Sequence, residues 1–464
     1  MEKEYRIEKD ALGELKVPAE AYWGIQTQRA LENFPVTGQK VNLSLIRAYC
    51  LVKKACALAN QEFKLLEEKE AQAVIRACDE VIEGKLSDQF PLDALQGGAG
   101  TSTNMNVNEV LANRAIEILG GRPGDYTLLD PIEDVNRNQS TNDTYPTALK
   151  AAAILKFREL SAQIAALQGA LQNKEKEFAK VVKIGRTELQ EAVPITLGRE
   201  FGAFSEAIAR DRWRVFKCEE RLRIVNIGGT AVGTGLTAPR EYIFLVIETL
   251  RRVTGLGLAR GENLVDQTAN SDSFVEVSGI LKAHASNLIK ISRDLRLLNL
   301  LGEISLPQLQ PGSSIMPGKS NPVIPEAAAQ AGMKVIANDL IITQACSSGS
   351  LQINEFMPAI AQALLESLDI LININRLFAS HAAGITADEK KCRWYFDRSP
   401  AIITALLPHI GYAKAQELLA EFNNSGGDDL RVFLSGKLGG ELIEKVFDPY
   451  NLISLGYQSR EKNP

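Results

Sequence analysis

Long runs of apolar residues at helical spacing dominate this sequence. Between Asp272 and Leu301 one stripe recurs at intervals of three, four or seven positions, and its members are Phe274, Val277, Leu281, Leu288, Ile291, Leu295 and Leu298. A helix of about 30 residues is about 45 Å long. Such a stripe can be buried only against other helices of similar length, so the pattern predicts a mainly α-helical fold built on a long helix bundle.

Four further segments show the same periodicity. In the first of them, from Asp143 to about Val182, apolar residues fall at Leu160, Ile164, Leu167 and Leu171. The other three cover about 198–225, 325–346 and 355–380. A single coiled coil would require strict heptads with charged flanks, and the alanine-rich run 151–153 fits close packing in a bundle better.

The regions on either side of these segments carry shorter helical patterns. Glycines and prolines interrupt the chain before residue 143, and the helical patterns shorten again after about residue 390. We therefore expect three mainly helical domains. They comprise an N-terminal domain (1–141), a central domain with the long bundle (142–395) and a small C-terminal domain (396–464).

Composition excludes several classes of protein. The net charge of −5 comes without a basic stripe, which argues against binding of nucleic acid. We find no run of about 18 apolar residues and expect no membrane span. The N-terminus is charged from its second residue, which is unlike a secretory signal, so a cytoplasmic protein is expected.

Cysteine and histidine usage limits the possible chemistry. The six cysteines include no C-x-x-C pair, so we expect them to be reduced. The three histidines, His284, His381 and His409, stand far apart and lack the spacing of metal ligands. The sequence therefore predicts no metal or organic cofactor, and a catalytic site that uses little histidine.

Two polar stretches with clustered hydroxyls precede expected helices. The first, Gln96–Asn108, reads QGGAGTSTNMNVN, where glycines let backbone N–H groups approach an anion and hydroxyls follow at a helix start. A helix cap after a flexible loop explains this stretch equally simply, and taken alone we favour that interpretation. The second, Gln139–Asp143, offers two hydroxyls and an amide before the longest helix, and capping accounts for only some of them.

The third polar stretch, PGSSIMPGKSNPVIPE at residues 311–326, is the most informative. Its four prolines exclude a regular helix and predict a loop of 12 or more residues, a length typical of functional loops. Ser313 and Ser314 are candidates for a nucleophile or base, and Lys319 and Asn321 for anion contacts. Because no histidine lies nearby in the sequence, a serine base here needs backbone N–H groups and positive charge to stabilise its alkoxide.

These three stretches together resemble a known family. GSSIMPGKSNP is similar to the signature loop of the aspartase/fumarase superfamily, GSSxMPxKxNP, and the other two stretches resemble its conserved regions in the expected order. The resemblance covers essentially the whole chain from Pro18 onward. QGGAGTSTNMN and QSTNDTYPT are more similar to aspartases than to fumarases, which typically read QTGSGTQSNMN and SSND. Argininosuccinate and adenylosuccinate lyases share the loop but lack the continuous similarity.

The resemblance implies an activity and a set of roles. The expected reaction is the reversible conversion of L-aspartate to fumarate and ammonia, in which Ser313 removes a proton beside the β-carboxylate to give an aci-carboxylate intermediate. The implied contacts are Thr101, Ser140, Thr141 and Ser314 for the β-carboxylate, Lys319, Asn321 and Thr187 for the α-carboxylate, and Asn142 for the amino group.

The resemblance also implies an assembly. Members of the family are homotetramers whose long helices form one large bundle, and each active site combines the three regions from three different subunits. We therefore expect a homotetramer with shared active sites and a small dicarboxylate or amino-acid substrate.

Two positions depart from the family pattern. GRTELQ (185–190) carries Glu188 where His or Gln is usual, and Ser320 stands where Val is common. Glu188 faces solvent, pairs with an arginine such as Arg186, or lies near the substrate, where a carboxylate would attract an ammonium and repel carboxylates. A fumarate hydratase or a lyase for another aspartate-like amine therefore stays open as an alternative. A catalytically silent structural protein, as some crystallins are, is disfavoured because the site residues are intact.

Overall fold

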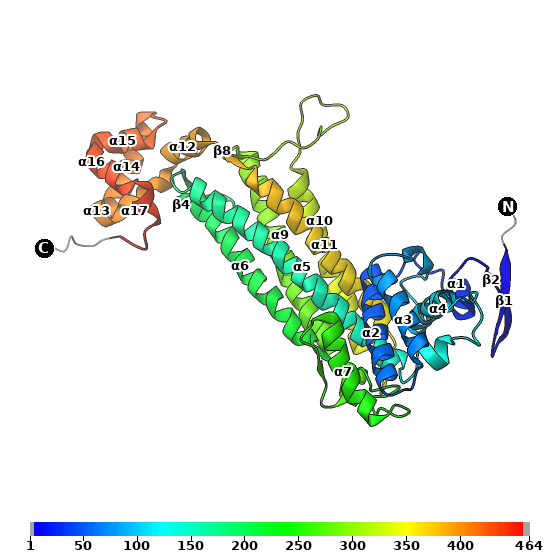
Figure 1. Cartoon of the computed structure of the whole chain (residues 1–464). Coiled ribbons are helices and arrows are strands. Elements are labelled where there is room, and N and C mark those ends of the chain that lie inside the picture. Colours follow the sequence, from blue (N-terminus) through cyan, green and yellow to red (C-terminus); the bar gives the residue numbers. More distant parts are fainter. Residues whose placement is uncertain (1–3, 458–464) are drawn as a thin grey trace. The chain divides into compact units, whose positions relative to one another are not determined.

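The structure is a computed structural model that describes residues 4–457 (Figure 1). The described chain forms two compact units, each assembled from three segments. The first unit takes 4–161, 214–283 and 334–371, and the second takes 162–213, 284–333 and 372–457. The expected division at residues 141 and 395 remains a prediction.

Five long helices correspond to the five periodic segments, and parts of them belong to each unit. They are α5 (Thr141–Glu177), α6 (Leu197–Leu222), α9 (Asp272–Leu301), α10 (Val323–Ser347) and α11 (Met357–Ala383). Helix α9 has the predicted bounds, and every member of its apolar stripe is at most 4% exposed. The mainly α-helical bundle predicted from the sequence is confirmed.

Contacts within the first unit link these helices side by side. An ion pair joins Lys156 of α5 to Asp369 of α11, and another joins Arg158 of α5 to Glu219 of α6. Further links are Arg221 to Glu276 between α6 and α9, Ser278 to Asp339 between α9 and α10, and Asn338 to Ser367 between α10 and α11. Each long helix in this unit is thus packed against neighbours on both sides.

In the second unit a buried polar cluster joins three long helices. His284 of α9 lies 3.0 Å from the carboxylate of Asp211 on α6 and 2.9 Å from the amide of Asn375 on α11. Phe178, the residue directly after α5, forms an edge-to-face pair with Phe201 of α6, and the ring centroids are 5.3 Å apart. The bundle core of this unit therefore contains specific polar contacts as well as apolar packing.

Helix α11 is the one described helix that is long and apolar enough to cross a membrane. Of its most apolar window, 67% is buried. Such burial is typical of a core helix in a bundle.

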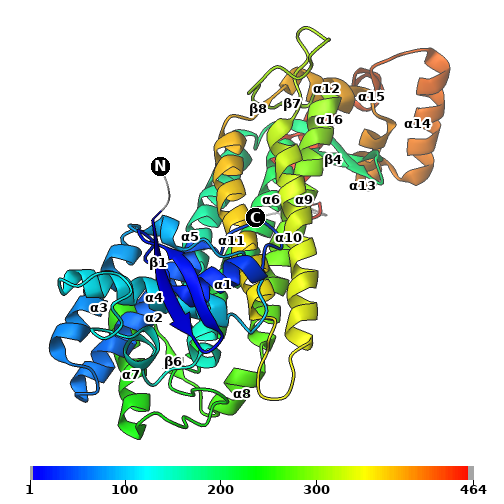
Figure 2. The same ribbon diagram turned by 90° about the vertical axis from the view of Figure 1, so that its right-hand side faces the viewer.

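The first unit also contains shorter helices and short strands. They are β1 (Tyr5–Asp10), β2 (Gly13–Pro18), α1 (Ile25–Asn33), α2 (Leu43–Glu62), α3 (Glu68–Ile82), η1 (Ser87–Gln89), α4 (Thr101–Ile118), the π-helix η2 (Pro131–Val135), β5 (Ile224–Val225), α7 (Arg240–Thr254), β6 (Ala259–Arg260) and α8 (Leu264–Ala269). Strands β1 and β2 form an antiparallel hairpin beside α1 (Figure 2).

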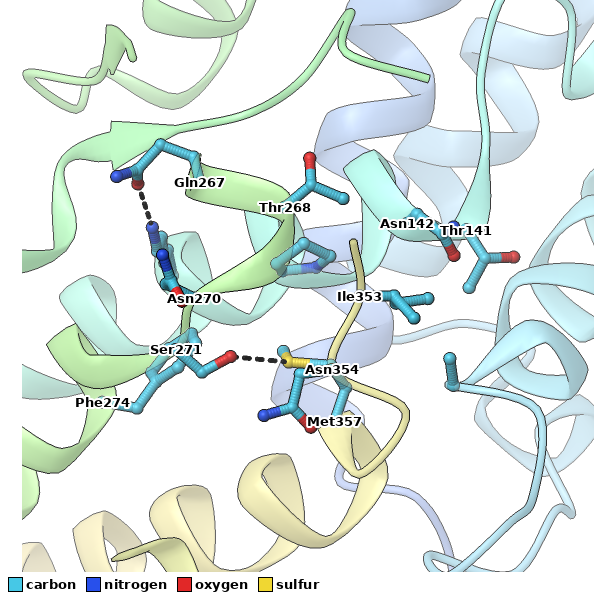
Figure 3. A pocket seen from close by; sticks show the side chains of 13 residues that line it. Thr141, Asn142, Gln267, Thr268, Asn270, Ser271, Phe274, Ile353, Asn354 and Met357 are labelled. Carbon is cyan, nitrogen blue, oxygen red and sulfur yellow. Dashed lines mark hydrogen bonds between the residues drawn. The ribbon is translucent and has the colours of Figure 1, made fainter. Parts of the chain in front are cut away.

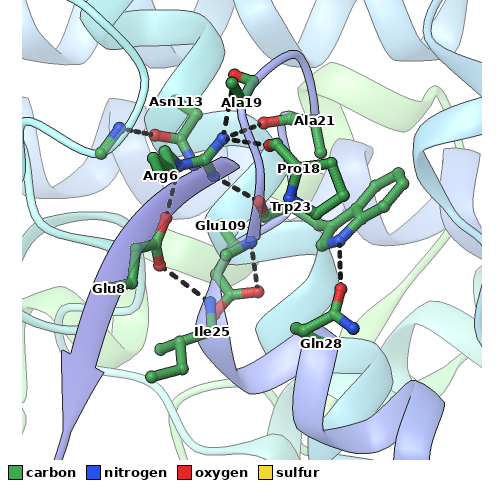
Figure 4. Close-up of polar contacts among 12 residues, drawn as sticks. Arg6, Glu8, Pro18, Ala19, Ala21, Trp23, Ile25, Gln28, Glu109 and Asn113 are labelled. Atoms are coloured by element: carbon green, nitrogen blue, oxygen red, sulfur yellow. Dashed lines mark hydrogen bonds and ion pairs between the residues drawn. The ribbon is translucent and has the colours of Figure 1, made fainter. Parts of the chain in front are cut away.

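Two buried carboxylates hold the start of α1 (Figure 4). Glu109 of α4 accepts hydrogen bonds from the backbone N–H groups of Gly24, Gln26 and Thr27, and Glu8 accepts one from Ile25. Unpaired N–H groups at a helix start favour negative charge. The acids therefore fix the first helix to the body of this unit.

The second unit contains the remaining strands and the C-terminal helices. They are β3 (Val182–Thr187), β4 (Gln190–Thr196), β7 (Ile304–Ser305), β8 (Thr386–Ala387), α12 (Glu389–Arg398), η3 (Pro400–Leu406), α13 (Leu407–Ile410), α14 (Tyr412–Ser425), α15 (Leu430–Leu438), α16 (Gly440–Val446) and α17 (Pro449–Ile453). Val182 and Ile184 of β3 belong to the same apolar cluster as the C-terminal helices, so the β3–β4 hairpin is anchored to them.

Candidate active site

The first polar stretch forms a tight turn that leads into α4. Gly98, Ala99 and Gly100 all have left-handed backbone conformations, with φ of 78°, 57° and 87°. A Cβ atom at Gly100 would lie 2.3 Å from the ring of Tyr145 on α5, so only glycine allows this approach. The turn brings exposed Thr101, the first residue of α4, to the beginning of α5.

Part of the second stretch is a helix cap. Ser140 Oγ accepts the N–H of Asn142 at 3.2 Å, and Asp143 Oδ1 accepts the N–H of Ser140 at 2.9 Å. This reciprocal pattern satisfies donors at the helix start, as the simpler interpretation expected. In this cap the hydroxyl of Ser140 acts only as an acceptor, so the hydroxyl proton of Ser140 is still available to a ligand. Thr141, 7% exposed, does not take part in the cap.

Asn142 is held through both its side chain and its main chain. Its Nδ2 donates to the carbonyl of Ala231 at 2.6 Å. Its own carbonyl accepts the side chain of Asn226 at 3.0 Å. With Nδ2 engaged, the atom that Asn142 can offer to a cation such as an ammonium is Oδ1.

The loop that supplies these contacts was not predicted from the sequence. Residues 226–236 contain four glycines, at positions 228, 229, 233 and 235, and this density was the signal available. Asp143, fully buried, accepts the N–H groups of Gly228 at 3.1 Å and Thr230 at 2.9 Å. Burial raises the pKa of Asp143 to about 6, and the N–H donors act in the opposite direction. This carboxylate fixes the glycine-rich loop against the first turn of α5.

A small cavity lined by both polar and apolar side chains lies beside Thr141 and Asn142 (Figure 3). The cavity volume open to the centre of a water-sized sphere is about 10 Å³, which is enough for about one water molecule. Asn142, Pro146 and Lys150 line it from successive turns of α5, and Gln267, Asn270 and Asn354 contribute amides. Lys150, 3% exposed, donates to the carbonyl of Ile224 at 2.7 Å and to Gln267 at 3.0 Å. Burial lowers the pKa of Lys150 to about 8.

The third stretch lies in the second unit as a loop between β7 and α10. The loop covers residues 306–322 and is visible as the long excursion above β7 and β8 in Figure 2. Pro325 falls in the first turn of α10, where a helix needs no N–H from it. The amide of Asn321 donates to the carbonyl of Gly312 at 2.8 Å, and the N–H of Gly312 donates to the carbonyl of Lys319 at 2.7 Å. These bonds close the loop on itself.

Within this loop two backbone N–H groups contact the side-chain oxygen of Ser313. Its Oγ accepts the backbone N–H of Met316 at 2.9 Å and that of Ile315 at 3.2 Å. Backbone N–H groups, one of the two features expected to stabilise an alkoxide here, therefore contact this oxygen, and the role of Ser313 as a base stays a prediction. Ser314 and Lys319 are exposed, so both side chains can reach a ligand.

The β3–β4 turn presents Thr187 and Glu188. Thr187 pairs with Gln190, and the two residues between them have φ of 54° (Glu188) and 62° (Leu189), the backbone of a tight hairpin turn. Glu188 is exposed. Of the alternatives for this side chain, exposure to solvent agrees with the structure, whereas Arg186 lies 2.7 Å from buried Glu303.

The predicted site residues thus fall into two groups, one in each unit. Thr101, Ser140, Thr141 and Asn142 meet at the start of α5 in the first unit. Those in the second unit are Thr187 and Glu188 on the hairpin turn and Ser313, Ser314, Lys319 and Asn321 on the loop. Among residues 4–457, no group of three or more His, Cys, Asp or Glu side chains is arranged to hold a metal ion.

Comparison with known proteins places this arrangement in a family. A family model described as a lyase matches residues 13–337. Aspartate ammonia-lyase from Bacillus sp is 44% identical over 468 residues, which covers 99% of this chain and 100% of that protein.

Two solved structures have the same fold. Fumarate lyase:delta crystallin from Brucella melitensis bound to cobalt is 44% identical, with a TM-score of 0.92 over 96% of this chain and 99% of that one. Recombinant class II fumarase from Schistosoma mansoni is 31% identical, with a TM-score of 0.90 over 98% of this chain and 100% of that one. The chain therefore belongs to the lyase family of aspartases and fumarases that its three polar stretches predicted.

Proposed function

We propose that the chain is an aspartate ammonia-lyase that interconverts L-aspartate with fumarate and ammonia. The observation that carries the proposal is its full-length similarity to the Bacillus enzyme of that name, at 44% identity against 31% for the Schistosoma fumarase. The aspartase-like forms QGGAGTSTNMN and QSTNDTYPT agree with this assignment.

Ser313 is the proposed base. It takes the proton from the carbon that carries the β-carboxylate, and the N–H groups of Ile315 and Met316 stabilise its oxygen when that oxygen is negatively charged. The electron pair left on carbon moves onto the β-carboxylate to give an aci-carboxylate. Loss of the amine then forms the double bond of fumarate. Donors fixed in advance around the β-carboxylate lower the energy of this dianionic group.

The remaining site residues bind different groups of the substrate. Hydroxyls of Thr101, Ser140, Thr141 and Ser314 hold the β-carboxylate in this proposal, and Lys319, Asn321 and Thr187 hold the α-carboxylate. Asn142 contacts the amino group through Oδ1, which accepts hydrogen bonds, and the bond from its Nδ2 to the carbonyl of Ala231 holds the side chain in place. Each charged group of L-aspartate thus has a partner of suitable type.

We further propose a homotetramer in which each site combines residues from three subunits. The long helices carry large apolar side chains on their outer faces, including Trp213 and Phe216 on α6 and Met333 and Leu340 on α10, which are 59–69% exposed. Burial of such faces against further copies of the chain is favourable. The distribution of the site residues over two units agrees with sharing.

Glu188 is the reason for considering a second candidate function. A carboxylate on the hairpin turn favours a substrate with an extra cationic group, so a lyase for another aspartate-like amine is the second candidate. A fumarate hydratase is the third, and the 31% identity to the fumarase disfavours it.

One assay separates these functions. The absorbance of fumarate formed from L-aspartate, L-malate and N-substituted aspartates is followed in parallel with the purified protein, without added metal. We expect turnover of L-aspartate with release of ammonia. Turnover of L-malate alone would replace the proposal with a hydratase, and turnover of an N-substituted aspartate alone would move it to the second candidate.

A further inference from the structure

A cluster of four charged side chains, two of them buried (Lys183 and Glu303) and two partly buried (Arg186 and Glu200), lies at the base of the hairpin turn in the second unit. Glu303, with a fully buried side chain, lies 2.7 Å from Arg186 and 2.8 Å from Lys183. Lys183, 2% exposed, also lies 2.6 Å from Glu200 on α6. Two cations and two carboxylates make the cluster neutral, which limits the cost of burying them.

The cluster joins three separate parts of the chain. Arg186 and Lys183 belong to β3, and Glu303 directly precedes β7. The carbonyl of Glu303 accepts the N–H of Asp388 at 2.9 Å, just before α12. The guanidinium of Arg186 lies over the ring of Tyr395 on α12, 5.0 Å from its centroid. The side chain and main chain of Glu303 therefore tie the hairpin, β7 and α12 together.

Stability alone does not explain this cluster. Removing charges from water costs about as much as their attraction returns, and apolar replacements of buried ion pairs are often neutral or stabilising. Directly beyond Arg186 the hairpin turn holds two non-glycine residues, Glu188 and Leu189, in left-handed conformations. Such conformations are unfavourable for residues other than glycine. A strained turn keeps its geometry only if its base is rigid, and the ion cluster supplies that rigidity.

We infer that Arg186 and Glu303 are positioning residues, whose buried ion pair fixes the turn that carries Thr187 and Glu188 relative to the strand from which the Ser313 loop departs. This inference rests on the proposed function only for the roles of Thr187 and Ser313. It assigns a purpose to two side chains that are not expected to touch the substrate.

The two site segments differ in their distance from the ion pair along the chain. Thr187 is the next residue after Arg186, whereas Ser313 follows Glu303 by ten residues and lies in a loop closed by its own hydrogen bonds. Loss of the ion pair should therefore displace Thr187 more than Ser313. Because Thr187 is assigned to the α-carboxylate, substrate binding should weaken while proton abstraction is largely kept.

The test compares Arg186→Gln, Arg186→Lys, Glu303→Gln and the double variant Arg186→Gln/Glu303→Gln. The double variant leaves the neutral pair of Lys183 and Glu200, so it should regain thermal stability relative to Glu303→Gln alone. Arg393→Gln is the matched control. Arg393 lies in the same unit, pairs with Asp397 at 2.9 Å and lies over the ring of Phe396.

Two quantities are measured for each folded variant, the steady-state constants for L-aspartate and the dissociation constant for fumarate. We expect Arg186→Gln to raise KM and the dissociation constant at least tenfold with kcat within threefold of the parent. Arg186→Lys should recover part of this loss. The double variant should regain stability but keep the raised KM, and Arg393→Gln should keep the parental KM.

Three results would overturn the inference. They are an unchanged KM and fumarate affinity in Arg186→Gln, a KM that follows the unfolding temperature across all variants including the control, and a double variant that recovers KM together with stability. Failure of the proposed function is visible separately, in the parent protein. If the parent turns over only another substrate, the same comparison applies to that substrate and to fumarate.

Discussion

The side-chain amide of Asn226 donates to the main-chain carbonyl of Asn142 across 3.0 Å. In a regular helix that carbonyl would accept the N–H of residue 146, but position 146 is a proline inside α5 and has no N–H. Asn226 is fully buried and is itself held by Thr147 at 3.3 Å and Thr268 at 3.0 Å. Because Pro146 leaves this carbonyl without its usual helical donor, the side chain of Asn226 binds it instead. Asn142, the proposed contact of the substrate amine, is thereby attached to a second segment of the chain.

This relationship makes a prediction about two substitutions. Asn226→Ala leaves a buried carbonyl without a donor and should lower the free energy of unfolding by ~1–3 kcal/mol. Pro146→Ala supplies a backbone N–H to the same carbonyl. The cost of Asn226→Ala should therefore be smaller, by about 1 kcal/mol, in the Pro146→Ala background. Denaturant unfolding of the four proteins measures this coupling, and strictly additive costs would show that Pro146 is not the reason for the Asn226 contact.

Ser313→Ala should reduce kcat for L-aspartate by at least about a hundredfold, the scale of losing a positioned base. The unfolding temperature should hardly change, because the N–H groups of exposed Ile315 and Met316 can bind water instead. Ser320→Ala, in the same loop and also exposed, is the matched control and should keep parental turnover. A Ser313→Ala protein with near-parental kcat would remove this serine from its role.

The lowered pKa of buried Lys150 predicts that the free energy of unfolding depends on pH. Its pKa is about 8 in the folded chain, because burial disfavours the charge, and 10.5 is the ordinary value. Between pH 8 and 10.5 the unfolded chain therefore binds more protons at this site, and stability rises with pH. Below pH 8 the cost of the buried charge is fully present. Lys150→Met has no titratable group at this position. Between pH 8 and 10 its free energy of unfolding should therefore increase by less than that of the parent protein.

The control for this comparison is Lys69→Met, at an exposed position of α3. It should follow the parent's curve across the same pH range. A constant difference between Lys150→Met and the parent from pH 7 to pH 10 would mean that Lys150 keeps its ordinary pKa in the folded chain.

The sequence predicted what local patterns encode. The stripe from Phe274 to Leu298 is periodic, and α9 (Asp272–Leu301) contains all of it. The need for backbone donors at Ser313 followed from the absence of histidine nearby, and two such donors are present.

Long-range contacts were not predictable in this way. Asp143 holds Gly228, which lies 85 residues away, and Arg186 holds Glu303, 117 residues away. Each of these pairs joins segments that carry no shared pattern, so only the folded chain shows them. For the same reason the sequence left open whether Arg186 would pair with Glu188.

The last prediction concerns Glu188, whose carboxylate is exposed on the hairpin turn while Arg186 is bound elsewhere. Near a substrate carboxylate it would repel by roughly 4 kcal/mol, for unit charges 4 Å apart at an effective dielectric of 20. Near the ammonium it would attract, through a charge-assisted hydrogen bond. Glu188→Gln keeps the shape and has the same steric demand at a φ of 54°, so the substitution changes only the charge.

We therefore expect Glu188→Gln to retain or improve kcat/KM for L-aspartate and to weaken any turnover of a more basic amine. Glu191→Gln on β4, whose carboxylate accepts Ser399 at 2.7 Å, is the control for removal of a nearby negative charge. It should leave the preference between the two substrates unchanged, because that carboxylate is already engaged. A loss of L-aspartate turnover by a hundredfold or more in Glu188→Gln would mean that the carboxylate itself takes part in the reaction, as an acceptor for the leaving amine, and does not merely tune which substrate binds.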